Sequence, residues 1–116
     1  MSPRTTNPAF MTGVPELLIL RLLSEREMYG YGIVQAVESA SGEAIKLGES
    51  VVYPALHALE ALGCLKSRRK AVNGRTRVYY TATAAGKKRL GTMVGEWQRI
   101  TEAVAGIVMG GKHVAV

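Results

Sequence analysis

The segment SVVYPALHALEALGCLKSRRKAVNGRTRVYYTAT (residues 50–83) changes its hydrophobic period halfway along, and this change decides the fold. In the first half, apolar residues recur every three or four positions, which predicts an amphipathic helix. The buried face of that helix is expected to comprise Val52, Leu56, Leu59 and Gly63, flanked by Ala55 and Leu62. The opposite face carries Ser50, Pro54, His57 and Ala61, with Tyr53 at the boundary. One face therefore belongs to a core, and the other is free to contact a partner.

Two residues indicate where this helix begins. Ser50 is a preferred N-cap residue, because its hydroxyl can accept a hydrogen bond from a backbone N–H of the first turn. Pro54 would then lie in the first turn after Ser50, where its missing N–H costs at most one intrahelical bond.

The second half of the segment has the period of a β-hairpin. Asn73 and Gly74 both tolerate the positive φ of a type I′ turn, which is the strongest short hairpin signal, and residues 75–82 alternate as a strand does. We therefore expect a two-stranded basic wing, after which Thr83 caps a last helix that runs to about Met109.

The region before this segment contains two further helical patterns. The first helix is expected from Thr12 and Pro15 to near Ser24, and the second from about Tyr31 to Ser41, with Gly42 as its C-terminal cap. Residues 1–12 lack periodicity and predict a flexible arm in which Arg4 is available to a phosphate.

The positive charge of the chain is concentrated in the wing. Fifteen Lys and Arg against nine acidic residues give a net charge of +6. Six of the basic residues lie in one stretch without an acid: Lys66, Arg68, Arg69, Lys70, Arg75 and Arg77. Such a run is often only a solvated surface, but its place on a hairpin after an amphipathic helix favours contact with DNA phosphates.

Composition excludes several other classes. At 116 residues without an internal repeat, the chain is expected to form one domain. Its longest apolar run, residues 17–23, is far shorter than the roughly 20 residues needed to cross a bilayer. No signal-peptide pattern is present and Cys64 is the single cysteine, so a cytoplasmic protein is expected. Two distant histidines and no aspartate argue against a metal, a cofactor or an enzyme.

The order of elements is that of a winged helix-turn-helix, in which the third helix enters the major groove and the wing lies on the adjacent backbone. The expected fold is mainly α with a small β-hairpin, followed by a C-terminal dimerisation helix. The expected divisions are a flexible arm (1–12), a winged helix DNA-binding domain (13–83), a dimerisation helix (84–109) and a flexible tail (110–116).

Several motifs resemble the PadR family of bacterial transcriptional regulators: YGYGI (29–33), SVVYPALHALEALGCL (50–65), GRTRVYYTATAAGKKRL (74–90) and the later Trp97. The resemblance covers about residues 14–100 and implies a homodimeric repressor whose final helix makes the dimer. It implies DNA contacts from the second helix, the recognition helix and the wing: Tyr31, Ser50, Tyr53, Pro54, His57, Arg75 and Arg77. The basic run adds Arg68, Arg69 and Lys70 to these candidates.

Three positions depart from the family pattern. Ala58 stands where many members have an arginine, so one phosphate or base contact is expected to be missing. Gly32 stands where an acid is common, and Cys64 where an aliphatic residue is common; neither change threatens the fold.

Some candidates also have a purely structural interpretation. Tyr53 would close the edge of the core, and His57 would be a solvated surface residue. Cys64 is expected to be a small buried apolar residue. Glu60 is expected to anchor the structure, through a cation if one is near, because a carboxylate facing phosphate would oppose binding.

The last helix carries a heptad seam, spaced three and four residues apart: Leu90, Met93, Trp97, Ile100, Val104 and Ile107. A domain of this size cannot cover the whole seam, which predicts a partner helix and a two-fold dimer that reads an inverted repeat. In short members of the family an aromatic residue at the place of Trp97 lines a space that accepts flat apolar compounds. The resemblance thus implies an effector site bordered by Trp97 and Met93; the alternative is that Trp97 only packs.

Two other functions remain open. A winged helix can bind an acidic protein partner through its basic wing, or the chain can be a drug-sequestering protein whose binding residue is Trp97.

Overall fold

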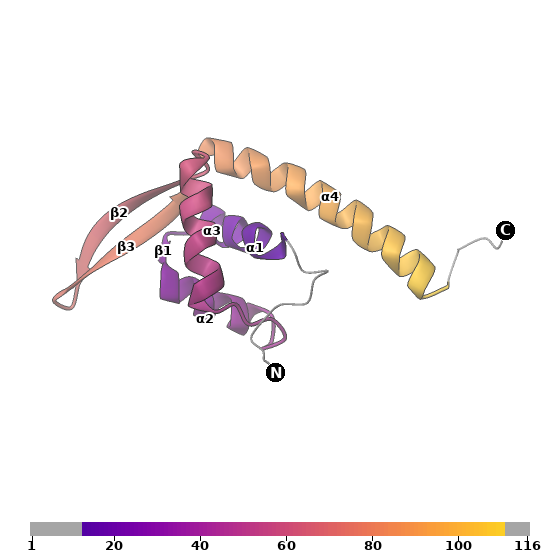
Figure 1. Cartoon of the computed structure of the whole chain (residues 1–116), viewed down its shortest axis with the longest axis horizontal. Helices are drawn as coiled ribbons and strands as arrows, with labels where there is room; N and C mark the ends of the chain where they lie inside the picture. Colours follow the sequence, from indigo (N-terminus) through magenta and orange to yellow (C-terminus); the bar gives the residue numbers. More distant parts are fainter. Residues whose placement is uncertain (1–12, 111–116) are drawn as a thin grey trace.

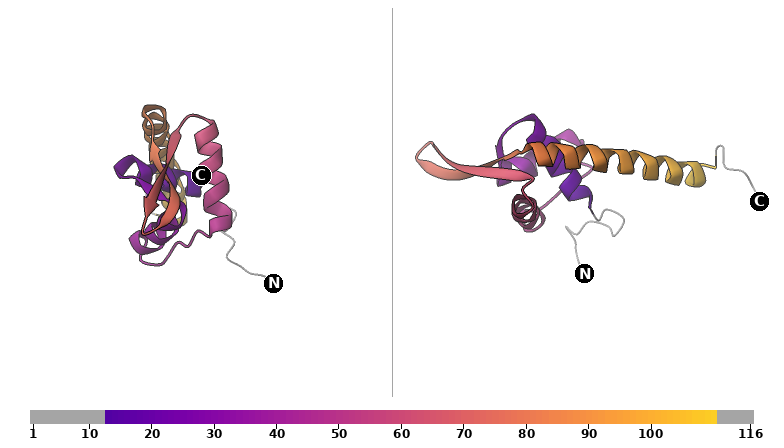
Figure 2. Two further views of the ribbon diagram at one scale, coloured as in Figure 1. Left: turned by 90° about the vertical axis from the view of Figure 1, so that its left-hand side faces the viewer. Right: turned by 90° about the horizontal axis from the view of Figure 1, so that it is seen from above.

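The computed structural model describes residues 13–110, which form four helices and a three-stranded antiparallel sheet (Figure 1). The helices are α1 (Val14–Glu25), α2 (Gly30–Ala40), α3 (Glu49–Ala61) and α4 (Ala84–Val108), and the strands are β1 (Met28–Tyr29), β2 (Leu65–Val72) and β3 (Arg75–Ala82). The first three helices gather at the centre, while the β2–β3 wing and α4 extend in opposite directions (Figures 1 and 2). The predicted arm and all of the predicted tail except Gly110 lie outside the described residues.

The core forms where the apolar faces of the first three helices meet. Its fully buried side chains come from these helices and from the loop before α3: Ile19, Leu20, Leu23, Ile33, Leu47, Val52, Leu56 and Leu59. Tyr80 of β3 and Leu90 of α4 close the core at its edges. This packing confirms the predicted buried face of α3 at its three central positions and turns the opposite face outward.

Both ends of α3 differ from the prediction. The N-cap residue is Gly48, whose carbonyl oxygen accepts hydrogen bonds from the N–H groups of Val51 and Val52, each at 3.0 Å. Ser50 is therefore inside the helix and caps nothing, and Pro54 lies in the helix interior instead of the first turn. The cause is that an extended glycine backbone starts the helix two residues before the residue with the best capping side chain.

The C-terminal end of α3 is a Schellman motif. The N–H of Cys64 donates to the carbonyl of Leu59 and the N–H of Gly63 donates to that of Glu60, both at 2.9 Å, while Gly63 has a φ of 79°. Gly63 was expected on the buried face, but it is exposed and ends the helix, and Leu62 is 60% exposed. Gly63 is needed for its positive φ and not for burial, and helical spacing alone cannot predict this backbone conformation.

The sheet contains the predicted hairpin and one strand that was not predicted. Asn73 and Gly74 have φ values of 52° and 76°, so the type I′ turn is confirmed, with Val72 opposite Arg75. The short strand β1 pairs with β3 and places Tyr29 opposite Tyr79. The strand order β1-β3-β2 makes β1 an edge strand that joins the wing to the helical body.

The wing and α4 meet at a tight junction. Thr83 is the N-cap of α4, as predicted: its hydroxyl oxygen accepts from the N–H of Gly86 at 3.1 Å, and the hydroxyl donates to the carbonyl of Gly63 at 2.6 Å. A Cβ on Gly86 would lie 2.1 Å from the carbonyl oxygen of Cys64. Only glycine allows the two backbones to approach this closely.

Candidate nucleic-acid interface

The outer face of α3 presents the predicted recognition residues to solvent. Ser50, Pro54 and His57 are exposed, whereas Tyr53 is half-buried. The Tyr53 ring lies against Gly30, where an added Cβ would come within 2.4 Å of it. Gly30 is thus a glycine because the ring covers its backbone, and the structural interpretation of Tyr53 is supported. Tyr31, the next residue of α2, is 45% exposed.

Strand alternation divides the basic residues of the wing between two faces. The register places five of the six on one face, here called the cationic face: Lys66, Arg68, Lys70, Arg75 and Arg77. Arg69 lies on the opposite face together with Ser67, whose hydroxyl donates to the Glu60 carboxylate of α3 at 2.6 Å. Glu60 therefore anchors β2 to α3, as expected of a structural residue, through a hydroxyl and not a cation.

The cationic face contains an acid that the sequence does not reveal. Glu27, immediately before β1, accepts hydrogen bonds from Nε and Nη2 of Arg68 at 2.5 and 2.9 Å and from Nζ of Lys70 at 3.1 Å. These two donors, Arg68 before Lys70, lower the pKa of the Glu27 carboxyl from its ordinary 4.5 to about 2. The wing lacks an acid in sequence but has one in space.

Two tyrosines complete the cationic face. The Tyr29 and Tyr79 rings lie with their centroids 5.5 Å apart. The Lys70 ammonium lies 4.3 Å from the centroid of Tyr79, and the Arg77 guanidinium carbon 4.4 Å from that of Tyr29. Sequence reasoning missed Glu27 and Tyr29, because a two-residue strand has no periodicity that would announce it.

The remaining cations of the wing have no carboxylate partner within residues 13–110. They are Lys66, Arg69, Arg75 and Arg77. Lys66, Arg75 and Arg77 lie on the cationic face, with Arg75 beside the turn, whereas Arg69 lies on the face whose Ser67 bonds α3.

The heptad seam of α4 changes its surroundings along its length. Leu90 is 6% exposed and belongs to the chain's own core, and Met93 packs against that core. The exposed fraction then rises from 45% at Trp97 through 48% at Ile100 and 52% at Val104 to 67% at Ile107. The second half of the seam is therefore an apolar stripe without cover in residues 13–110.

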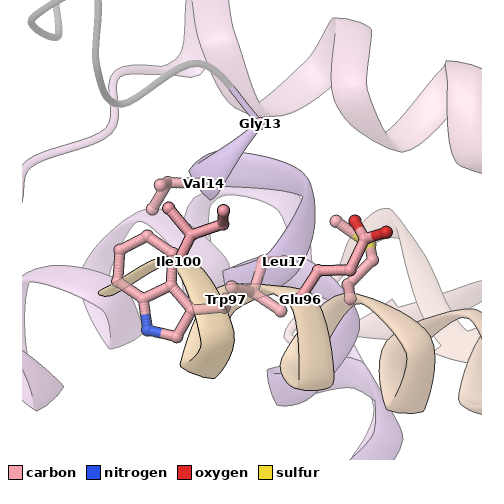
Figure 3. Close-up of a pocket in the computed structure, with 7 residues that line it drawn as sticks. Gly13, Val14, Leu17, Glu96, Trp97 and Ile100 are labelled. Atoms are coloured by element: carbon pink, nitrogen blue, oxygen red, sulfur yellow. The ribbon is translucent and has the colours of Figure 1, made fainter. Parts of the chain in front are cut away.

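An open cavity of about 290 Å³ lies where α1 meets the middle of α4 (Figure 3). Its lining comprises Gly13, Val14, Leu17, Met93, Glu96, Trp97 and Ile100. The predicted effector residues Trp97 and Met93 thus share one cavity, with the Glu96 carboxylate beside them.

Other kinds of site are not evident in residues 13–110. No group of three or more His, Cys, Asp or Glu side chains is close enough to hold a metal ion there. Among the described helices, none is long and apolar enough to span a membrane. Cys64 is buried and unpaired by a disulfide, as expected of a small packing residue.

Comparison with known proteins agrees with this architecture. A family profile described as "Transcriptional regulator PadR-like family" matches residues 19–92. The chain is 35% identical over 107 residues to transcriptional regulator Rv3488 of Mycobacterium tuberculosis, covering 91% of this chain and 94% of that protein.

Solved structures show the same fold. A transcriptional regulator from Clostridium thermocellum superposes with a TM-score of 0.81 at 27% identity, covering 89% of this chain and 98% of the other. A PadR family transcriptional regulator from Eggerthella lenta gives a TM-score of 0.75 at 25% identity, covering 85% of each chain. The winged fold, the motifs and these matches together show that the chain belongs to the PadR-like family of transcriptional regulators.

Proposed function

We propose that this transcriptional regulator is a homodimeric repressor that binds an inverted-repeat operator. The observation that carries the proposal is the position of the exposed face of α3, with Ser50, Pro54 and His57, beside a wing with unpaired cations. Within this proposal, residues 13–83 bind DNA and residues 84–109 form the dimer. The polar face of α3 reads base edges in the major groove, and the wing contacts the adjacent phosphates.

The dimer part of the proposal rests on α4. Four apolar residues follow one another along its outer half with about half or more of each side chain exposed: Trp97, Ile100, Val104 and Ile107. A second copy of the same helix would cover this stripe in the geometry of a coiled coil. Two-fold symmetry would then place the recognition helices about 34 Å apart, one turn of DNA.

The first test is fluorescence anisotropy of the protein on the DNA upstream of its own gene, with a scrambled duplex as control. We expect tighter binding to the upstream duplex and a steep loss of affinity with salt, about 0.9 log units of affinity per log unit of salt for each phosphate contacted. Equal binding to both duplexes, or affinity that hardly changes with salt, would contradict an operator-binding regulator.

The cavity at Trp97 supports the release of the repressor by a planar apolar effector. Trp97 and Met93 offer an aromatic and an adaptable wall, and Glu96 would balance a cationic ligand. Titration of the Trp97 fluorescence with planar dyes tests this part. A signal change at micromolar dye that also weakens DNA binding is expected, and an unchanged signal with every compound would leave Trp97 as a packing residue.

The two alternatives make different predictions in the same assays. A protein-interaction module would bind an acidic protein through the wing without competition from duplex DNA. A drug-sequestering protein would respond to dyes at Trp97 while its DNA binding stays weak at physiological salt. The Ser67–Glu60 contact holds the wing beside α3, and four wing cations have no carboxylate partner in residues 13–110; both observations favour the repressor over the two alternatives.

A further inference from the structure

Glu27 occupies an unusual place for an acid in a surface expected to meet phosphate. It directly precedes the edge strand β1, and its carboxylate reaches across β3 to two cations of β2. Its side chain is 21% exposed, whereas Arg68 and Lys70 are 64% and 39% exposed. The acid is thus enclosed by its partners, and the partners remain open to solvent and to a ligand.

The geometry of the contact with Glu27 determines which donors of Arg68 remain available to a DNA phosphate. Both Nε and Nη2 of the guanidinium donate to the two oxygens of the same carboxylate, which is the bidentate arrangement that a phosphate would otherwise accept. A DNA phosphate can use this Nε–Nη2 edge of Arg68 only by displacing Glu27, whereas Nη1 is not used by Glu27. The contact therefore sets a competition between an internal and an external anion.

We propose that Glu27 limits the sequence-independent affinity of the wing for DNA by competing with phosphates for Arg68 and Lys70. Phosphate contacts add affinity for every sequence, whereas base contacts distinguish one sequence from another. By occupying two of the wing's cations, Glu27 lowers the sequence-independent part of the DNA affinity. The base contacts proposed for the exposed face of α3 are unaffected. This inference rests on the proposed function, because it assumes that the wing meets DNA.

The competition does not depend on pH in the physiological range. The low pKa of Glu27, about 2, keeps the carboxylate ionised there. The other charged groups near it are the cations Lys66, Arg77 and the two partners themselves. Only an anion that binds the cations more strongly than Glu27 does would release them.

A second role for Glu27 predicts the opposite result. If the carboxylate only fixes the orientation of the wing, the neutral variant Glu27→Gln should bind DNA more weakly, with an unchanged salt dependence. If it competes with phosphate, the same variant should bind more tightly and with a steeper salt dependence. The sign of the change therefore separates the two roles.

The experiment compares the wild type, Glu27→Gln and Glu25→Gln by anisotropy on the upstream and scrambled duplexes between 50 and 200 mM salt. Glu25→Gln is the matched control, because it also removes one charge and one ion pair, the exposed pair with Arg21, but lies on α1. For Glu27→Gln we expect the log-log slope to steepen by about 0.9 for each cation that gains a phosphate. Each such gain makes the affinity fall about 3.5-fold more over this salt range.

Binding to the scrambled duplex measures the sequence-independent affinity without a contribution from the operator sequence. Glu27→Gln is expected to tighten binding to the scrambled duplex as much as to the upstream duplex, so the preference between them stays the same. Glu25→Gln is expected to match the wild type within about 0.3 log units of slope. An unchanged or weaker affinity for Glu27→Gln, or an equal change in both variants, would overturn the inference.

A variant that leaves Glu27 in place guards against a folding defect. Arg68→Gln and Lys66→Gln remove equal charge from the cationic face of β2, two residues apart, but only Arg68 is paired with Glu27. Lys66→Gln is expected to flatten the salt slope by up to about 0.9, and Arg68→Gln by clearly less. Equal losses in both variants would mean that Glu27 does not withhold Arg68 from phosphate.

Failure of the proposed function can be distinguished from failure of this inference. If the wild type binds neither duplex in a salt-dependent way, the repressor proposal falls. The salt concentration needed to elute each variant from immobilised heparin, a sulfated polyanion, then tests the competition by Glu27 without DNA. Glu27→Gln should elute at higher salt than the wild type and Glu25→Gln, and elution at the same salt would overturn the competition.

Discussion

The wing and α4 both extend beyond the helical body, but the wing exposes charged groups whereas α4 exposes apolar side chains. On the wing, two of the six cations are paired with Glu27, and tyrosine rings lie against Lys70 and Arg77. On the outer half of α4, the apolar stripe from Trp97 to Ile107 has no cover in residues 13–110. A charged surface can remain in water with partial pairing, whereas an apolar stripe of this length is stabilised by burial. The exposed stripe therefore supports the proposal that a second chain covers α4.

The largest effect is expected from a charge on the α4 stripe. Val104→Glu should leave the winged domain folded but prevent dimerisation, and DNA affinity should fall at least about 100-fold because the two half-sites are no longer bound together. Light scattering after size-exclusion chromatography and anisotropy on the upstream duplex measure the two losses. Gln98→Glu, on the opposite side of α4 by helical spacing, is the control and should remain dimeric. A variant that stays dimeric at Val104 would show that the stripe is not the interface.

A destabilising effect is expected at the junction of the two extensions. Gly86→Ala would place a Cβ against the Cys64 carbonyl oxygen and should lower the free energy of unfolding by about 1–3 kcal/mol. Gly91→Ala in the same helix meets no atom within 4 Å and should instead be neutral or stabilising by up to about 1 kcal/mol. Urea unfolding of both variants makes the comparison, and equal effects would argue against a close contact at Gly86.

A smaller loss is expected at Thr83, which links the last residue of β3 to the first of α4. Thr83→Ala removes both the cap to Gly86 and the bond to Gly63, and should cost about 1 kcal/mol of unfolding free energy. Thr83→Ser retains the hydroxyl and should recover most of the loss. If serine fails to recover it, the methyl group and not the hydroxyl stabilises the junction.

The smallest effect concerns the acid on the wing. Because the folded pKa of Glu27 lies below its ordinary value of 4.5, its pairing contributes stability that is fully present above about pH 4.5 and lost as the pH falls toward 2. The difference in unfolding free energy between the wild type and Glu27→Gln should therefore shrink between pH 5 and pH 3 and disappear toward pH 2, measured by urea titration. A difference that stays constant over this range would exclude the ion pair as its source.

The parts of the fold that show a regular spacing of apolar residues, or a residue typical of a turn or a helix cap, could be predicted from the sequence. The buried face of α3, the Asn73-Gly74 turn, the Thr83 cap and the exposed half of the α4 seam all carry such a signal. The predicted start of α3 and the predicted burial of Gly63 were wrong, because caps built from backbone geometry leave no side-chain pattern in the sequence. Glu27 and Tyr29 could not be found, since their partners lie about forty or fifty residues away in sequence and are brought close only by β1 pairing with β3.

The single residue between β3 and α4 has a mechanical consequence. Only Thr83 links the wing to α4, and its hydroxyl bonds Gly63 at the end of α3 and Gly86 in α4, so the wing and the first turns of α4 are expected to move together as one lever. Trp97 lies thirteen residues along that lever, about 20 Å from its pivot. In the proposed dimer, a small change in the angle at which the two α4 helices cross at Trp97 would swing both wings relative to the DNA axis, and the distance between the half-sites would change with it.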